Sequence, residues 1–314
     1  MMRRDKAQGS RPIWKHADRL ALGSKPYSIV AAPGLDLPAK RYLHVPAHGS
    51  HTASRMLEAV HDASDLPAPG RALLDFWNHI EAGTPPYLSA GAIQVRNAPG
   101  PMPSGLSAKA YFKPRLLPGM GIRPAASALV RAIEKTQPGP GREMIDEIVR
   151  RHGIEEIFYI ACGLRPDLEV ETYHDVEFRR GDYGAGEIRE IARGLAHHDE
   201  IARCAERCVA LAEGSPMACN HISCDLWPLD GGGVTVVLTA LDEPGARRSD
   251  QMELICAIAG LEGSMSPVPR RVEDIEILAG MHPSVVAVKI APVAGVVRHA
   301  LLVEEVDPEF AELL

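Results

Sequence analysis

An internal repeat dominates the sequence. Two strand-like segments, residues 28–33 and 40–47, precede two segments whose apolar residues recur at helical spacing. The same order of two strands and two helices begins again at residues 87, 156 and 221, at intervals of about 60 to 70 residues. A final strand pair ends the pattern, so the sequence predicts ten strands and four helix pairs.

The repeat predicts a closed barrel. Strands joined by short turns pair in the antiparallel sense, and a sheet of ten strands avoids exposed edges if it closes on itself. The helices bury their apolar stripes against the apolar strand faces, so the polar strand faces turn inward. We therefore expect an α+β fold, a ten-stranded antiparallel β-barrel with a solvent-filled lumen inside a ring of outer α-helices. Residues 24–314 form this single domain and residues 1–23 form an N-terminal arm.

The composition, with 46% hydrophobic and 24% charged residues, is typical of a soluble globular protein. A formal charge of −7 gives no general reason to bind nucleic acid or an anionic membrane, so any cationic site must be local. The N-terminal segment lacks the apolar core of a signal peptide, and no run of about 18 uncharged apolar residues occurs. We expect a cytoplasmic protein without nucleic-acid or membrane partners.

Six cysteines occur without a CxxC pair, which in a chain of this length predicts reduced thiols and no disulfide. Cys204 and Cys208 are one helical turn apart, and with His197 or His198 they would have the residue types of a zinc site. The simpler interpretation, which we prefer, is that both thiols pack on the buried side of an amphipathic helix.

Residues 107–115, SAKAYFKPR, alternate polar and apolar side chains. As a strand, this segment carries Lys109, Tyr111 and Lys113 on one face, and Phe112 with two alanines on the other. Its polar face is therefore both cationic and phenolic.

Repeated strand–strand–helix–helix units that close into a barrel with a polar lumen resemble the aromatic prenyltransferases of the ABBA, or PT-barrel, superfamily. The likeness covers residues 24–306. KAYFKPR is similar to the K-x-Y-F-x-P strand of the dimethylallyltryptophan synthase branch, whose Lys and Tyr bind the prenyl diphosphate; here they are Lys109 and Tyr111. The resemblance implies a transferase of secondary metabolism that moves a dimethylallyl or similar prenyl group from an allylic diphosphate to an aromatic, indole-like acceptor or another nucleophile, including a peptide side chain.

Such a reaction separates an allylic carbocation from a pyrophosphate, so the site needs fixed cations for the phosphates and aromatic faces around the carbocation. Strand parity and the resemblance together give the predicted substrate-binding residues: Arg41, Arg96, Lys109, Tyr111, Tyr159, Tyr173, His221 and Lys289. The chain has no DDxxD-type run, so we expect no required metal, and Mg²⁺ would act only as an auxiliary of the diphosphate.

The third repeat departs from the family pattern. Glu169 and Glu171 stand where the family has an Arg and a Lys, while Tyr173 is retained. Glu171 lies on the same predicted strand face as Asp175, and Asp225 lies on another strand. We take Glu171 and Asp225 as the candidate catalytic bases, since burial raises the proton affinity of a carboxylate.

Two other functions stay open at this point. The lost cations favour a barrel that uses no diphosphate and acts as a lyase, cyclase or isomerase, with Glu171, His221 and Asp225 as acid and base. The third interpretation is a non-catalytic barrel that binds a hydrophobic small molecule.

Overall fold

The computed structural model describes residues 28–31, 39–44, 78–79, 82–83, 88–97, 106–115, 118–119, 124, 127–129, 131–132, 150–151, 156–164, 172–179, 183–225, 233–241, 248–261, 280–293 and 295–306. On the first six strands the description is mainly of backbone path and register.

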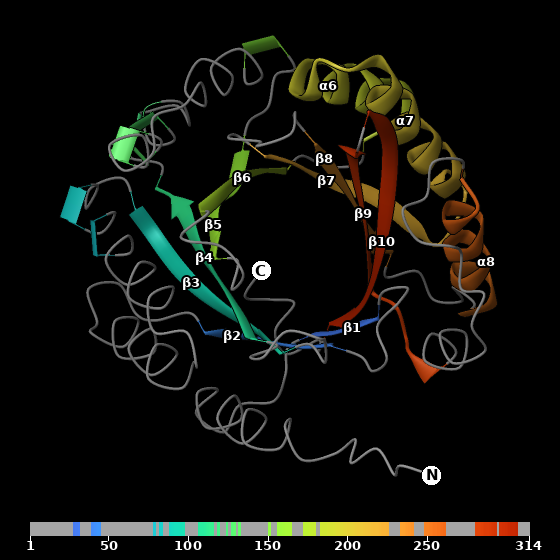
Figure 1. Ribbon diagram of the computed structural model, residues 1–314, viewed down its shortest axis with the longest axis horizontal. Helices are drawn as coiled ribbons and strands as arrows, with labels where there is room; N and C mark the ends of the chain where they lie inside the picture. Colours follow the sequence, from blue (N-terminus) through green and yellow to red (C-terminus); the bar gives the residue numbers. More distant parts are fainter. Residues whose placement is uncertain are drawn as a thin grey trace, which may run out of the picture.

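Ten strands pair in the antiparallel sense and follow one another around a ring (Figure 1). Each strand pairs with its neighbours in sequence, and β1 also pairs with β10, where Ser28 lies opposite Val306. The strands are β1 (Ser28–Ala31), β2 (Ala39–His44), β3 (Leu88–Asn97), β4 (Leu106–Pro114), β5 (Glu156–Leu164), β6 (Thr172–Arg179), β7 (Met217–Asp225), β8 (Val234–Ala240), β9 (Val285–Val293) and β10 (Val296–Val306).

Three helices lie outside the ring, α6 (Ala185–Ala196), α7 (Asp199–Ala212) and α8 (Arg248–Ala259) (Figure 1). They occupy the helical segments that the third and fourth repeats predict. The helices predicted for the first two repeats fall largely outside the described residues, as does the second helix of the fourth. The prediction of an antiparallel sheet with outer helices is confirmed. None of the helices in the described part of the chain is long and apolar enough to span a membrane.

The apolar core lies between the outer face of the sheet and the helices. Strand β9 shows the alternation most clearly, because Val286, Val288 and Ile290 are fully buried whereas Ala287 and Lys289 are half-buried. The same core contains the buried faces of α6 and α7, where apolar residues recur every three to four positions. Burial of these side chains, rather than helix propensity, therefore holds the helices against the sheet.

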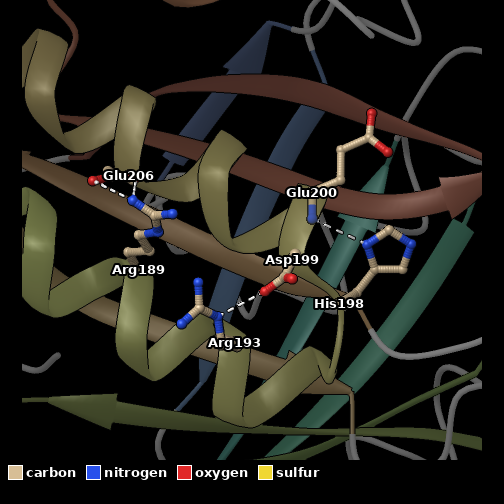
Figure 2. A network of polar contacts seen from close by, with 6 residues as sticks. All are labelled: Arg189, Arg193, His198, Asp199, Glu200 and Glu206. Carbon is tan, nitrogen blue, oxygen red and sulfur yellow. Dashed lines mark hydrogen bonds and ion pairs between the residues drawn. The ribbon is translucent and has the colours of Figure 1, made fainter.

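Ion pairs link α6 and α7 on their solvent side (Figure 2). Arg193 lies 2.7 Å from Asp199, and Arg189 lies 3.1 Å from Glu206. At the start of α7 the Nδ1 atom of His198 accepts a hydrogen bond from the backbone N–H of Glu200 at 3.3 Å, which satisfies one of the unpaired donors of the first turn. Because both ion pairs are exposed to solvent, each contributes little to stability.

Replacing a buried residue of α6 should therefore cost more stability than breaking the nearest ion pair. We expect Ile191→Ala to lower the free energy of unfolding by about 2 to 5 kcal/mol, because Ile191 is fully buried between helix and sheet. Arg193→Ala, which removes the pair with Asp199, should cost less than about 1 kcal/mol. Urea unfolding of both variants measures the difference; equal losses would contradict this account of the helix layer.

Candidate active site on the inner face of the barrel

The inner face of the sheet follows from strand alternation. Phe112, Ile160, Ile222 and Val288 are fully buried in the core under the helices, which fixes the outer face of β4, β5, β7 and β9. Neighbouring positions on these strands lie on the inner face, and cross-strand partners share a face. The register therefore extends the assignment around the whole ring.

Predicted cations of β2, β3 and β4 lie together on this face. Arg41 pairs in register with Arg96, and Gln94, two positions before Arg96, pairs with Lys109. The fourth cation, Lys289, is on β9, five strands from β4 in a ring of ten and hence on the opposite wall. The structure thus puts three of the four predicted cations on one wall of the barrel.

The predicted tyrosines occupy inner-face positions next to these cations. Tyr111 is two residues after Lys109 on β4, and Tyr173 is aligned with Lys109 through Gly163 on β5. Tyr159 falls on β5 one step further along the barrel axis, in the row of Glu177. The phenolic positions therefore adjoin the cationic wall.

Acidic positions gather on β6 and β7. Asp175 lies directly opposite Asp225 in the register, and Glu177 lies opposite Ser223, whose side chain is buried. Glu171 precedes the first residue of β6 and lies outside the described residues, as does Glu169, so the structure places neither of them.

Two inner-face charges were missed in the sequence analysis. The alternation that puts Tyr173 and Asp175 on the inner face continues to Glu177 and Arg179, and Arg179 lies opposite the predicted residue His221. The signal was present in the sequence, since all four positions have the same parity on one strand. The inner face of β6 therefore carries a basic residue at its end as well as two acidic ones.

The cysteines of α7 are buried, in agreement with the preferred interpretation. Cys204 and Cys208 face the core, whereas His197 and His198 are exposed at the junction of α6 and α7. Within the described ranges no three His, Cys, Asp or Glu residues are arranged to hold a metal ion. The five cysteines that the structure describes there, Cys204, Cys208, Cys219, Cys224 and Cys256, are free thiols.

Comparison with known proteins gives similarity in structure alone. No family model and no curated protein matches the sequence. AnaPT from Neosartorya fischeri superposes with a TM-score of 0.61 at 13% identity, over 89% of this chain and 77% of AnaPT. The 5-dimethylallyl tryptophan synthase from Streptomyces coelicolor, solved in complex with DMASPP and Trp, has a TM-score of 0.58 at 14% identity, over 95% of this chain and 88% of its own.

A third structure agrees with these two. The 6-dimethylallyltryptophan synthase from Micromonospora olivasterospora, also in complex with DMASPP and Trp, superposes with a TM-score of 0.57 at 11% identity, over 89% of this chain and 81% of its own. These similarities extend over nearly the whole chain, and the predicted resemblance is confirmed at the level of the fold. The protein has the PT-barrel fold of the ABBA superfamily of aromatic prenyltransferases.

Proposed function

We propose that this protein is a prenyltransferase that moves a dimethylallyl or similar prenyl group from an allylic diphosphate to an aromatic or other nucleophilic acceptor inside the barrel. The observation that carries the proposal is the register, which assigns Arg41, Arg96, Lys109 and Tyr111 to neighbouring inner-face positions. The fold supports it, because solved proteins with this fold were crystallised with a prenyl diphosphate analogue and tryptophan.

The wall formed by β2, β3 and β4 suits a diphosphate. A leaving pyrophosphate carries several negative charges, and fixed cations in a site sheltered from bulk water stabilise those charges as they develop. Arg41, Arg96 and Lys109 come from three consecutive strands, so their relative positions are set by the sheet. We assign the diphosphate to this wall and its ionisation to these cations.

The tyrosine positions suit the other half of the ionised substrate. When the allylic C–O bond breaks, the pyrophosphate leaves with the electron pair and the carbocation needs protection from water. Aromatic faces attract cations through their quadrupole and exclude water. We assign this role to Tyr111, Tyr159 and Tyr173, on the three adjacent strands β4, β5 and β6.

The acidic positions on β6 and β7 suit the acceptor. A carbon or nitrogen atom of the acceptor forms the new bond to the prenyl carbon and must then lose a proton. Neighbouring carboxylates hold protons more tightly than isolated ones, which favours a general base. Asp225, opposite Asp175, is our candidate for that base, together with Glu171; the same wall would attract an acceptor that carries an amine.

The acidic wall also favours a second candidate function. Asp225 and His221 are two strand positions of one face apart from each other on β7, next to Arg179 and Asp175 of β6, which is a set of groups suited to acid–base chemistry without a diphosphate. A lyase, cyclase or isomerase would use this set alone. Binding of a diphosphate analogue separates the two functions, since the second function makes no use of the wall formed by β2, β3 and β4.

Calorimetric titration with dimethylallyl thiolodiphosphate tests the diphosphate wall. We expect micromolar binding by the wild-type protein and at least about tenfold weaker binding by Lys109→Ala, because a hydrogen bond to a charged group contributes about 1.5 to 3 kcal/mol. Lys40→Ala is the matched control, since position 40 is adjacent to Arg41 and lies on the other face of β2. Binding unchanged in Lys109→Ala, or lost equally in both variants, would refute the assignment.

Replacing the candidate base should separate activity from stability. Asp225→Asn should lower kcat by about 10²-fold or more, because general base catalysis typically contributes 10²- to 10⁴-fold. The same change should raise the free energy of unfolding at pH 7 by roughly 0.2 to 1 kcal/mol, since it removes a like-charge pair with Asp175. The control is Glu190→Gln on the exposed side of α6, which should change neither quantity. Wild-type kcat in Asp225→Asn would exclude the assigned role.

Removal of divalent metal should leave most of the prenyl transfer. The proposal assigns the pyrophosphate charge to Arg41, Arg96 and Lys109, so the turnover rate in excess EDTA should stay within about threefold of the rate with Mg²⁺, a barrier difference of less than about 1 kcal/mol. Product formation measured by chromatography in the two buffers gives the ratio. Complete loss of turnover in EDTA, restored by Mg²⁺, would show that a metal takes the role assigned to the cations.

A further inference from the structure

A buried group of two thiols and one imidazole lies between α7 and the sheet. Cys204 is 3% exposed and Cys208 is fully buried, one turn apart on α7. His299 of β10 is 1% exposed and belongs to the same layer, on the outer face of its strand. None of these residues lies on the inner face that the prenyl transfer uses.

The hydrogen bonds of His299 fix its protonation pattern. Its Nε2 atom lies 3.1 Å from the carbonyl oxygen of Ile258, in the last turn of α8. A carbonyl oxygen only accepts, so Nε2 carries the proton and donates. Nδ1 is buried and has no hydrogen-bond partner among the described residues. The neutral imidazole therefore keeps a free acceptor inside the layer.

Cys204 is the thiol that ionises in this group. A hydrogen bond from the Cys208 thiol lowers the pKa of Cys204 to about 5, against the opposing effect of burial; a hydrogen bond and the charge of His299 and the charge of Arg207 lower it further. The pKa of Cys208 is raised by its hydrogen bond to Cys204, by burial and by the neighbouring thiols of Cys204 and Cys219. Cys208 thus holds its proton and donates to Cys204.

We propose that Cys204 is a modification site, a nucleophilic thiol supported by His299 that is thiolated by small disulfide-type reagents. The Cys204 sulfur attacks one sulfur of the reagent RS–SR; the new Cys204–S–SR bond forms, the old S–S bond breaks, and RS⁻ leaves with the electron pair. Positions four apart in a helix have Cβ atoms about 5 to 6 Å apart, whereas a disulfide needs about 3.5 to 4.5 Å. Cys208 therefore acts as hydrogen-bond donor and does not form an internal disulfide with Cys204.

The arrangement has the three parts of an activated nucleophile: a thiol, a base beside it, and a third group that orients the base. Here the orienting group is the Ile258 carbonyl, so one imidazole connects β10, α7 and α8. The attached group enters a close-packed layer, which the packing of that layer resists. Thiolation of Cys204 consequently loosens α7 from the sheet, and reduction reverses the change.

The pH dependence of thiolation tests the proposal. The intact protein is treated with methyl methanethiosulfonate, which transfers a CH₃S group and releases methanesulfinate, at pH 6 and at pH 8, with N-acetylcysteine in the same tube. Peptide mass spectrometry measures the rate at Cys204. An ordinary thiol of pKa about 8.5 reacts roughly 75-fold faster at pH 8 than at pH 6. We expect the rate at Cys204 to change by less than about twofold. Cys256, the exposed cysteine of α8, reports the access of reagent to the helix layer.

Two variants separate activation from access. His299→Gln keeps an N–H for the Ile258 carbonyl but removes the imidazole, and Cys208→Ala removes the donor of the hydrogen bond. In each variant the Cys204 rate should fall at least about fivefold at pH 6 relative to its rate at pH 8, whereas Cys256→Ser should leave the Cys204 profile unchanged. The proposal is overturned if folded wild-type protein is not thiolated at Cys204, or if its rate rises with pH in parallel with N-acetylcysteine.

Discussion

The apolar layer between the sheet and the outer helices determines the rest of this structure. Val286, Val288 and Ile290 of β9 are fully buried there, as are Ile188 and Ile191 of α6. Because side chains alternate along a strand, burying one face outside commits the other face to the interior of the ring. The layer thus sends the polar positions of ten strands inward, and ring closure between β1 and β10 keeps them there.

The inward face is divided by charge. Basic positions come from β2, β3 and β4, acidic ones from β6 and β7, and tyrosines from β4 to β6 between them. An anionic prenyl donor and a nucleophilic acceptor that must lose a proton need opposite surroundings, and a closed sheet provides both at fixed spacing. The helix layer has its own chemistry at Cys204 and His299, on the other side of the same sheet.

Much of this could be predicted from the sequence, because alternation and repeat order are local signals. They indicate the strands of each repeat, the helices outside, and the parity of Lys109 and Tyr111. Bulges are less visible: the register shifts between Cys219 and His221 on β7, so the buried residues Cys219 and Ile222 are three positions apart instead of two. The contact of Cys204 with His299 joins residues of α7 and β10, a distance along the chain that no local pattern reports.

A crystal structure of the protein with dimethylallyl thiolodiphosphate tests the central claim, that a closed sheet turns a charged face inward to hold a prenyl diphosphate. We expect the diphosphate inside the ring, against β2, β3 and β4, with the Lys109 ammonium within hydrogen-bond distance of a phosphate oxygen. A diphosphate bound outside the ring, or a sheet left open between β1 and β10, would contradict the account.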